Sequence, residues 1–254
     1  SEWRERYAYA QRAMEELRAL DERAAVQPLT VEEAWERARL TGEFRGNDAA
    51  IPLLTEVVRL DPDHFGTNYA LGAILHERND LAAIPYLERA MERDPTLVLP
   101  VCEWIEELLA RNGRAFEGLR YRERAEQHRH LLRLAERERQ AVSAGDRFEP
   151  HGLSAAQIAE LRAQLARYEE VRRAYLVRKA VRYFPEMPFY VLAIVPAGGF
   201  LGLQSARRSR ELVDRLSSQL ELPGEGYIVI LDDYQRALRK KLEKQGDALL
   251  FARD

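Results

Sequence analysis

The chain repeats itself at an offset of 33 residues, and this repeat restricts its possible folds more than any other feature. Segment 47–54 (NDAAIPLL) aligns with 80–87 (DLAAIPYL), and Asp61-Pro62 aligns with Asp94-Pro95. A period of 33 to 34 residues with two helical patterns in each period is typical of a helix-turn-helix solenoid. Neither helix of such a unit buries its apolar face until the next unit stacks on it. The sequence therefore predicts stacked helical hairpins.

The second unit carries the fullest motif. Its motif residues are Leu71, Gly72, Asn79, Asp80, Ala83, Leu87, Ala90 and Pro95. Their order resembles the tetratricopeptide repeat (TPR) family, in which small residues let two antiparallel helices approach closely and a closing proline ends the second helix. The resemblance implies a mainly α fold, a TPR-like right-handed helical solenoid.

Two further units flank this one. The first begins at Thr30, which forms a capping box with Glu33, but it has Arg39 where the family has a small glycine and Gly42 inside its first helix. We expect this unit to pack loosely. The third unit lacks a closing proline, so its second helix is expected to run from Arg114 to Ala144 and to cap the stack. It includes Trp104, Leu108, Gly113, Gly118, Leu119 and Ala125.

The rest of the chain suggests one helix before the repeats and one small domain after them. Trp3, Tyr7, Ala10, Met14 and Leu17 recur at steps of four and three, the spacing of a helix packed along a narrow seam. After a break at Gly145, apolar strand-like runs alternate with helical stretches, which indicates a small α+β domain. The expected strands are 174–181, 189–195, 227–231 and 248–251, and the expected helices follow Ser154 and cover 205–220 and 233–245. We therefore predict an N-terminal packing or linker helix at 1–29, three TPR-like units with a capping helix at 30–144, a linker at 145–153 and a small α+β domain at 154–254.

The TPR resemblance implies a peptide-binding groove lined by the first helix of each unit. The residues expected there are Glu33, Glu36, Leu40, Tyr69, Ala73, His76, Cys102, Glu106 and Leu109. This surface is acidic and apolar, and the repeats contain no lysine that could clamp a C-terminal carboxylate. We expect an extended or helical polypeptide with apolar and basic side chains as the partner. The alternative is that these residues only face solvent.

A second candidate site lies in the C-terminal domain. Gly198, Gly199 and Gly202 follow a predicted strand and precede a helix with Arg207 and Arg208, an arrangement that places backbone N–H groups and positive charge around an anion. The pattern is neither G-x-G-x-x-G nor a P-loop, so an apolar connecting loop is the alternative. From Val171 onward there are 15 Lys/Arg against 10 Asp/Glu. Nucleotide or nucleic-acid binding by this basic domain therefore stays open, although the net charge of -3 makes a nucleic-acid partner an unfavoured expectation.

The sequence offers no catalytic centre. Segment 76–80 (HERND) has Asp80 where the zinc-peptidase motif H-E-x-x-H needs its second histidine. His128 and His130 are two residues apart on a predicted helix and point to different sides. We expect no catalytic residue, no metal and no cofactor. The single cysteine, Cys102, favours a reducing compartment and hence the cytoplasm.

The order of motifs along the chain suggests a narrower context. An aromatic N-terminal helix, the repeats, segment 146–152 (DRFEPHG) and segment 174–179 (AYLVRK) before Phe184-Pro185-Glu186 are together similar to the C-terminal region of bacterial HtpX-like (CAAX-prenyl-protease-like) zinc metallopeptidases. This implies a non-catalytic region that binds or positions polypeptides for a membrane-linked peptidase, as the soluble portion of a longer, membrane-bound protein. An independent TPR adaptor is the alternative. The oligomeric state is left open.

Overall fold

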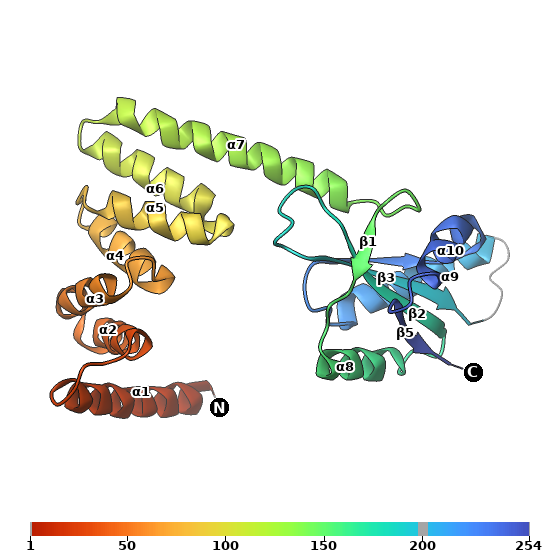
Figure 1. Ribbon diagram of the computed structural model, residues 1–254, viewed down its shortest axis with the longest axis horizontal. Helices are drawn as coiled ribbons and strands as arrows, with labels where there is room; N and C mark the ends of the chain where they lie inside the picture. The colour runs from red at the N-terminus through yellow and green to blue at the C-terminus, as the bar shows by residue number, and fades with distance from the viewer. Residues whose placement is uncertain (1, 198–202, 254) are drawn as a thin grey trace. The chain divides into compact units, whose positions relative to one another are not determined.

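The computed structural model describes residues 2–197 and 203–253 and divides into two compact units, residues 1–129 and 130–254. The division falls inside one long helix, α7 (Ala115–Arg139). Figure 1 shows helices alone in the first unit and a mixture of helices and strands in the second. We call them the helical unit and the α/β unit. The prediction of a mainly helical region followed by a region of mixed helices and strands is confirmed.

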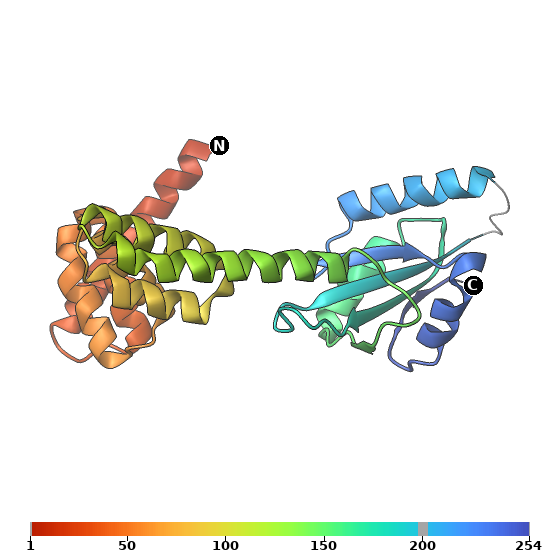
Figure 2. The same cartoon turned by 90° about the horizontal axis from the view of Figure 1, so that it is seen from above.

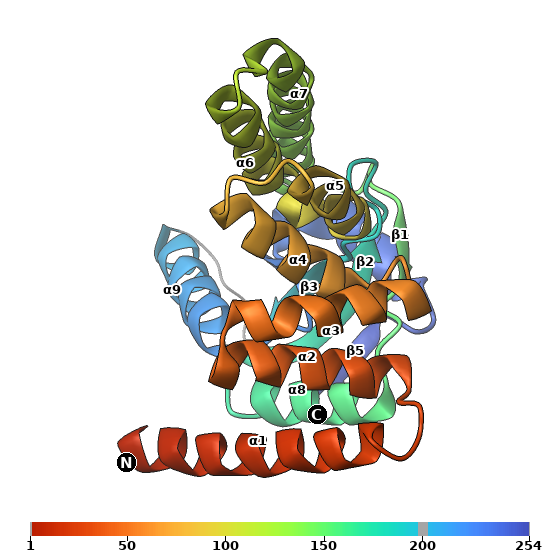
Figure 3. The ribbon, with the colours of Figure 1, turned by 90° about the vertical axis from the view of Figure 1, so that its left-hand side faces the viewer.

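The helical unit is a stack of paired helices. Helix α2 packs on α3 and α4 packs on α5, while α1 on α2, α3 on α4 and α5 on α6 join successive pairs (Figure 3). The helices are α1 (Glu2–Ala24), α2 (Val31–Arg45), α3 (Asn47–Leu60), α4 (Phe65–Glu77), α5 (Ala83–Arg93) and α6 (Val98–Arg111), with a 3-10 turn at Pro95–Leu97 and then α7. Each helix thus covers the apolar face of its neighbour, as the repeat requires.

Local sequence signals set where these helices begin and turn. Thr30 and Glu33 form the expected capping box at the start of α2, with Glu33 Oε2 accepting from the Thr30 backbone N–H at 2.9 Å. His64 caps α4 in an equivalent way, because its Nδ1 accepts from the Thr67 N–H at 3.2 Å. Asn79 turns the chain between α4 and α5 with a left-handed φ of 56°, a conformation that asparagine tolerates better than most residues.

The α/β unit contains one mixed sheet of five strands. The strands are β1 (Phe148–Pro150), β2 (Val171–Lys179), β3 (Phe189–Pro196), β4 (Gly226–Ile230) and β5 (Leu249–Ala252). They run in the order β1-β2-β3-β4, and β5 pairs with β2 beside β1. Only the β3–β4 pairing is parallel. β1 lies within the segment 145–153 that was expected to be a linker. It was not predicted as a strand because three residues are too few to show the alternating pattern of a strand.

Helices cover both faces of the sheet (Figure 2). On one face, α8 (Ala155–Leu165) and α9 (Leu203–Gln219) pack against Leu176, Leu192 and Ile194. On the other face, α10 (Arg236–Glu243) packs against their sequence neighbours Val177, Val191 and Ala193. Successive strand residues point to opposite faces, so one sequence run fills both cores. A strand buried on both faces reads as a continuous apolar run, which is why β3 was predicted within one residue of its bounds.

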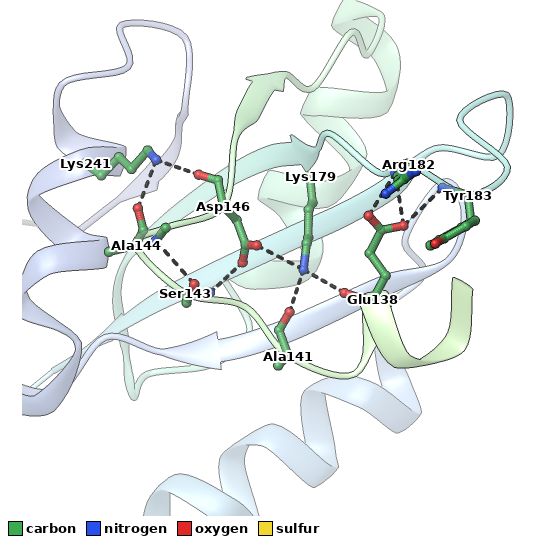
Figure 4. A network of polar contacts seen from close by, with 10 residues as sticks. Glu138, Ala141, Ser143, Ala144, Asp146, Lys179, Arg182, Tyr183 and Lys241 are labelled. Carbon is green, nitrogen blue, oxygen red and sulfur yellow. Dashed lines mark hydrogen bonds and ion pairs between the residues drawn. The ribbon is translucent and has the colours of Figure 1, made fainter. Parts of the chain in front are cut away.

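Helix α7 ends at Arg139, not at Ala144 as expected, because side chains of the α/β unit bind its last turn (Figure 4). Lys179 is 7% exposed, and its Nζ donates to the carbonyl oxygens of Glu138 at 2.7 Å and Ala141 at 2.8 Å. The same Nζ lies 3.3 Å from Asp146 Oδ1. A helix end leaves carbonyl groups without partners, and a buried lysine satisfies them here. A contact with β2, distant in sequence, therefore decides where the helix stops.

The side chain of Glu138 also holds the segment that follows β2. Its carboxylate accepts from the backbone N–H groups of Arg182 at 2.9 Å and Tyr183 at 3.1 Å (Figure 4). Arg139 is 7% exposed and donates to the Tyr183 and Phe184 carbonyl oxygens at 3.2 and 3.3 Å.

Within the described ranges, no helix is both long enough and apolar enough to cross a membrane.

Candidate polypeptide-binding face

The candidate site is the surface formed by the first helix of each pair, α2, α4 and α6, which we call the first-helix face. Tyr69, Ala73 and His76 occupy successive turns of α4 and are half-buried. They are therefore accessible in part while their positions are fixed by the helix. Two residues that the sequence analysis did not assign to the groove, Phe65 and Trp104, lie against them.

Aromatic rings from α4 and α6 form a continuous row on this face. The Phe65 and Tyr69 ring centroids are 6.4 Å apart, and those of Tyr69 and Trp104 are 6.0 Å apart. His76 also stacks on Trp104, with ring centroids 5.3 Å apart and an interplanar angle of 17°. Offset stacks of this kind hold rings in place beyond the effect of burial alone. We call Phe65, Tyr69, Trp104 and His76 the aromatic row.

A second aromatic contact fixes the start of α4. Trp35 of α2 lies against the His64 cap, with ring centroids 5.2 Å apart. The ring also covers Gly66, where an added Cβ would lie 2.7 Å from Trp35 Cζ2. Glycine is thus the residue that allows α2 and α4 to meet here. Because Gly66 lies beside Phe65, this contact also positions one end of the aromatic row.

Three residues predicted to line the groove are buried, and this part of the prediction is corrected. Leu40, Cys102 and Leu109 are at most 2% exposed and belong to the hydrophobic cores of the helical unit. A helix packed between two neighbours buries more than one side, and these three positions point to the neighbours. Burial raises the pKa of the Cys102 thiol, so this cysteine lacks the features of a nucleophile.

The glutamates expected to make the face acidic are paired within the chain. Hydrogen bonds from Thr30 lower the pKa of Glu33, which also pairs with Arg23. The remaining two are likewise held by arginines: Glu36 accepts from Arg39 at 2.6 Å, and Glu106 accepts from the Arg122 Nε at 2.8 Å. The face therefore offers aromatic surface more than unpaired negative charge.

Phe65 and Trp104 were not among the residues predicted to line the groove, although the sequence carries a signal for both. Phe65 precedes Tyr69 by one helical turn, the spacing that puts two side chains on one side of a helix. Trp104 follows Tyr69 by 35 residues, about one repeat, so both rings occupy similar places on successive first helices. The signal is visible only when aromatic residues are compared between repeats.

Much of the candidate anion site falls outside the described residues, and the site stays a prediction. Gly198, Gly199 and Gly202 lie outside the described part of the chain. Arg207 is exposed and its Nε donates to Glu211 one turn later at 2.8 Å, and Arg208 is exposed as well. Within residues 2–197 and 203–253, no group of three or more His, Cys, Asp or Glu residues is arranged to hold a metal ion. His76 of the HERND segment stacks on Trp104.

Comparison with known proteins finds similarity only in structure. No family model matches the chain, and no curated protein matches it. Solved structures of a protein named MamA resemble about half of the chain. MamA AMB-1 is 24% identical over 44% of this chain with a TM-score of 0.39, and the chain spans 61% of that structure, less than two thirds. Two other MamA structures are 17% and 16% identical over 50% and 45% of this chain and 68% and 67% of their own, with TM-scores of 0.42 and 0.39. At these identities and TM-scores, the likeness carries no inference about function.

Proposed function

We propose that the helical unit binds a polypeptide on its first-helix face and that the aromatic row supplies the main contacts. The single observation that carries the proposal is the stacked series of Phe65, Tyr69, Trp104 and His76, which spans α4 and α6 and begins with a Phe65 side chain that is 40% exposed. Rigid aromatic side chains of this kind contribute strongly to protein interfaces. Stacked helical repeats present extended surfaces to protein partners in general.

The pairing of charges defines the class of ligand. Glu33, Glu36 and Glu106 are bound by arginines of the same chain, so the face offers little unpaired negative charge to a basic ligand. His76 Nε2 is buried and makes no hydrogen bond within the described residues, and its ring packs against the Trp104 ring. We therefore expect a segment anchored by aromatic or aliphatic side chains, which revises the expectation of a basic ligand.

A peptide-array screen with the full chain tests this proposal. Bound peptides should be enriched in aromatic and aliphatic residues, and their affinity should change less than about threefold between low and high salt, because screening acts mainly on exposed charges. Tyr69→Ala and Phe65→Ala should each weaken binding by roughly tenfold. Phe116→Ala is the matched control, since Phe116 is an exposed aromatic residue on α7. Peptides that bind the Tyr69→Ala/Phe65→Ala variant as tightly as the wild type would disprove the proposal.

The narrower hypothesis concerns the context of this activity. Under this hypothesis, the first-helix face positions polypeptides for a zinc metallopeptidase. Its only support is the order of motifs in the sequence. It predicts an H-E-x-x-H motif and apolar membrane spans upstream of Ser1 in the same reading frame. If the complete reading frame lacks both features, the independent TPR adaptor is the remaining hypothesis.

The alternative of nucleotide or nucleic-acid binding by the basic α/β unit has its own test. It predicts that the protein is retained on a phosphate-bearing resin and that salt abolishes this retention.

A further inference from the structure

Helix α1 packs on the helix that follows it in the same way as the second helix of each repeat does. It packs on α2 as α3 packs on α4 and as α5 packs on α6. Helices α3 and α5 also pack along the first helix of their own pair, but within the described ranges no helix takes that position beside α1. Figures 2 and 3 show the N-terminal part of α1 extending past the neighbouring helices of its unit. Within the described ranges, one side of α1 therefore lacks the kind of partner that α3 has in α2 and α5 has in α4.

The uncovered part of α1 carries large apolar side chains. Only Ala13, Leu17 and Leu20 are buried, in the core they share with Leu40 of α2. In contrast, Trp3 is 75% exposed, Tyr7 54% and Met14 57%. A concentration of exposed apolar surface on a soluble unit commonly marks an interaction site.

These exposed side chains lie along one line of the helix. Trp3, Tyr7 and Met14 are separated by four and seven residues, which places them on the same side of α1. The rings of Trp3 and Tyr7 stack with centroids 5.6 Å apart and an interplanar angle of 11°. The Tyr7 hydroxyl also accepts from Gln11 Nε2 at 3.0 Å. We call Trp3, Tyr7 and Met14 the α1 seam.

The margins of the seam are basic. If the seam residues take the core positions of a heptad pattern, Arg4 and Arg6 take the positions on either side of the core. Side chains at these flanking positions form ion pairs with a partner helix. Both are exposed, and neither forms an ion pair with another described residue. The carboxylates of Glu5, Glu15 and Glu16 fall on the remaining sides of the helix. The uncovered surface thus combines an apolar line with unpaired positive charge.

A second copy of this chain would not match these margins. The flanking positions along the seam hold Arg4, Arg6, Gln11, Ala13 and Arg18, and none of them is acidic. Self-association through the seam would bring Arg4 and Arg6 near arginines of the second copy and would not supply either of them with a carboxylate. Charges at flanking positions determine partner choice in helix pairs, and like charges oppose pairing. The complementary surface is a helix with acidic margins.

We propose that α1 binds an amphipathic helix of a second polypeptide, with apolar residues along its contact line and Asp or Glu beside them. This helix lies along the side of α1 that the described helices leave exposed, and it covers Trp3, Tyr7 and Met14. Its carboxylates pair with Arg4 and Arg6. The surface is distinct from the aromatic row on α4 and α6, so the chain has two separate sites for polypeptides.

Two designed helical peptides test the proposal in the full chain. Both are about three heptads long with leucine at the core positions, and they differ only in having Glu or Lys at the flanking positions. Binding of labelled peptide is measured by fluorescence anisotropy. The acidic peptide should bind at least roughly tenfold more tightly than the basic one, because favourable ion pairs replace repulsion. Equal binding of the two peptides would overturn the proposal.

Two variants test which residues are responsible. Trp3→Ala/Tyr7→Ala should weaken binding of the acidic peptide by at least roughly tenfold. Arg4→Glu/Arg6→Glu should reverse the preference, so that the basic peptide binds more tightly. All four side chains are exposed, so these variants keep the core intact. Phe116→Ala should leave acidic-peptide binding unchanged, and repeating the measurements in a Phe65→Ala/Tyr69→Ala background separates this site from the aromatic row.

Other occupants of the seam give different results. A Trp3-dependent dimer in sedimentation experiments would identify a second copy as the occupant and contradict the proposal. Trp3-dependent binding to vesicles of phosphatidylglycerol and phosphatidylcholine, without a preference between the two peptides, would identify a membrane surface and contradict it as well. An unchanged charge preference in Arg4→Glu/Arg6→Glu would do the same.

Discussion

Gly72 of α4 and Leu87 of α5 meet so closely that a Cβ atom on Gly72 would lie 2.6 Å from Leu87 Cδ2 and 3.2 Å from the Leu87 backbone nitrogen. Such a separation is shorter than side-chain carbons adopt, so the two helices would have to move apart to admit even a methyl group. The family resemblance at Leu71-Gly72 thus has a direct physical cause in this chain. The glycine sets the distance between the helices of the second pair.

Substitution of this glycine should destabilise the helical unit. We expect Gly72→Ala to lower the free energy of unfolding by about 1–3 kcal/mol, because overpacking exceeds the gain of about 1 kcal/mol in helix propensity. Gly42→Ala is the matched control, since its Cβ would lie 3.4 Å from Ala50 Cβ, an ordinary contact. It should be neutral or stabilising. Urea unfolding followed by tryptophan fluorescence measures both variants. Equal unfolding midpoints for the two variants would show that Gly72 does not set the distance between α4 and α5.

The ion pairs of Asp21 should make the attachment of α1 dependent on pH. The Asp21 carboxylate accepts from Arg37 Nε and Arg45 Nη2, each at 2.7 Å. Burial tends to raise its pKa, but these hydrogen bonds and the two positive charges outweigh burial, so the pKa is lowered. A lowered pKa stabilises the fold above the unfolded value of about 3.9, and this stability is lost as the pH falls through the folded value.

Asp21→Asn should therefore cost about 0.5–1 kcal/mol at pH 7 and almost nothing once the pH lies below the folded pKa of Asp21. Urea midpoints of both proteins across this pH range measure the difference. Asp63→Asn is the control, because the Asp63–Arg93 pair is largely exposed. If the difference between wild type and Asp21→Asn stays constant down to acid pH, the ion pairs do not contribute as described.

Lys179 should be essential to the α/β unit. Lys179→Met leaves the carbonyl oxygens of Glu138 and Ala141 and the nearby Asp146 carboxylate without their buried donor. We expect a loss of about 2–4 kcal/mol, as for other broken buried ion pairs. The three tryptophans lie in the helical unit, so hydrogen exchange of β2 and β3 amides is the suitable measurement. Lys240 is exposed, so the control variant Lys240→Met should leave the exchange rates of the β2 and β3 amides unchanged. Unchanged rates in Lys179→Met would show that the Lys179 contacts do not stabilise the unit.

Cys102 should react slowly while the protein is folded. The thiol is 1% exposed, and burial raises its pKa, so little thiolate is present and reagents have poor access. Alkylation by iodoacetamide at neutral pH should be at least roughly a hundredfold slower than in urea, because reaction requires local opening. Mass spectrometry follows the modification. Similar rates in the two conditions would show that the thiol is accessible in the native state.

The sequence predicted the elements whose signals are local. The Thr30–Glu33 capping box and the turn at Asn79 lie within a few residues of the helices they bound, and both are observed. The strand β3 was predicted because its apolar run is continuous. In contrast, the three-residue strand β1 and the end of α7 depend on pairing with β2, which no local pattern shows.

For the candidate site, the sequence alone determined which helices form the first-helix face, because the repeat of 33 residues specifies the order of first and second helices. Only the tertiary structure decided which side chains are accessible there. It buries Leu40, Cys102 and Leu109, pairs Glu106 with Arg122, and places Trp104 against Tyr69. The physical reason is that helical periodicity depends on neighbours along the chain, whereas burial and charge pairing depend on contacts between helices.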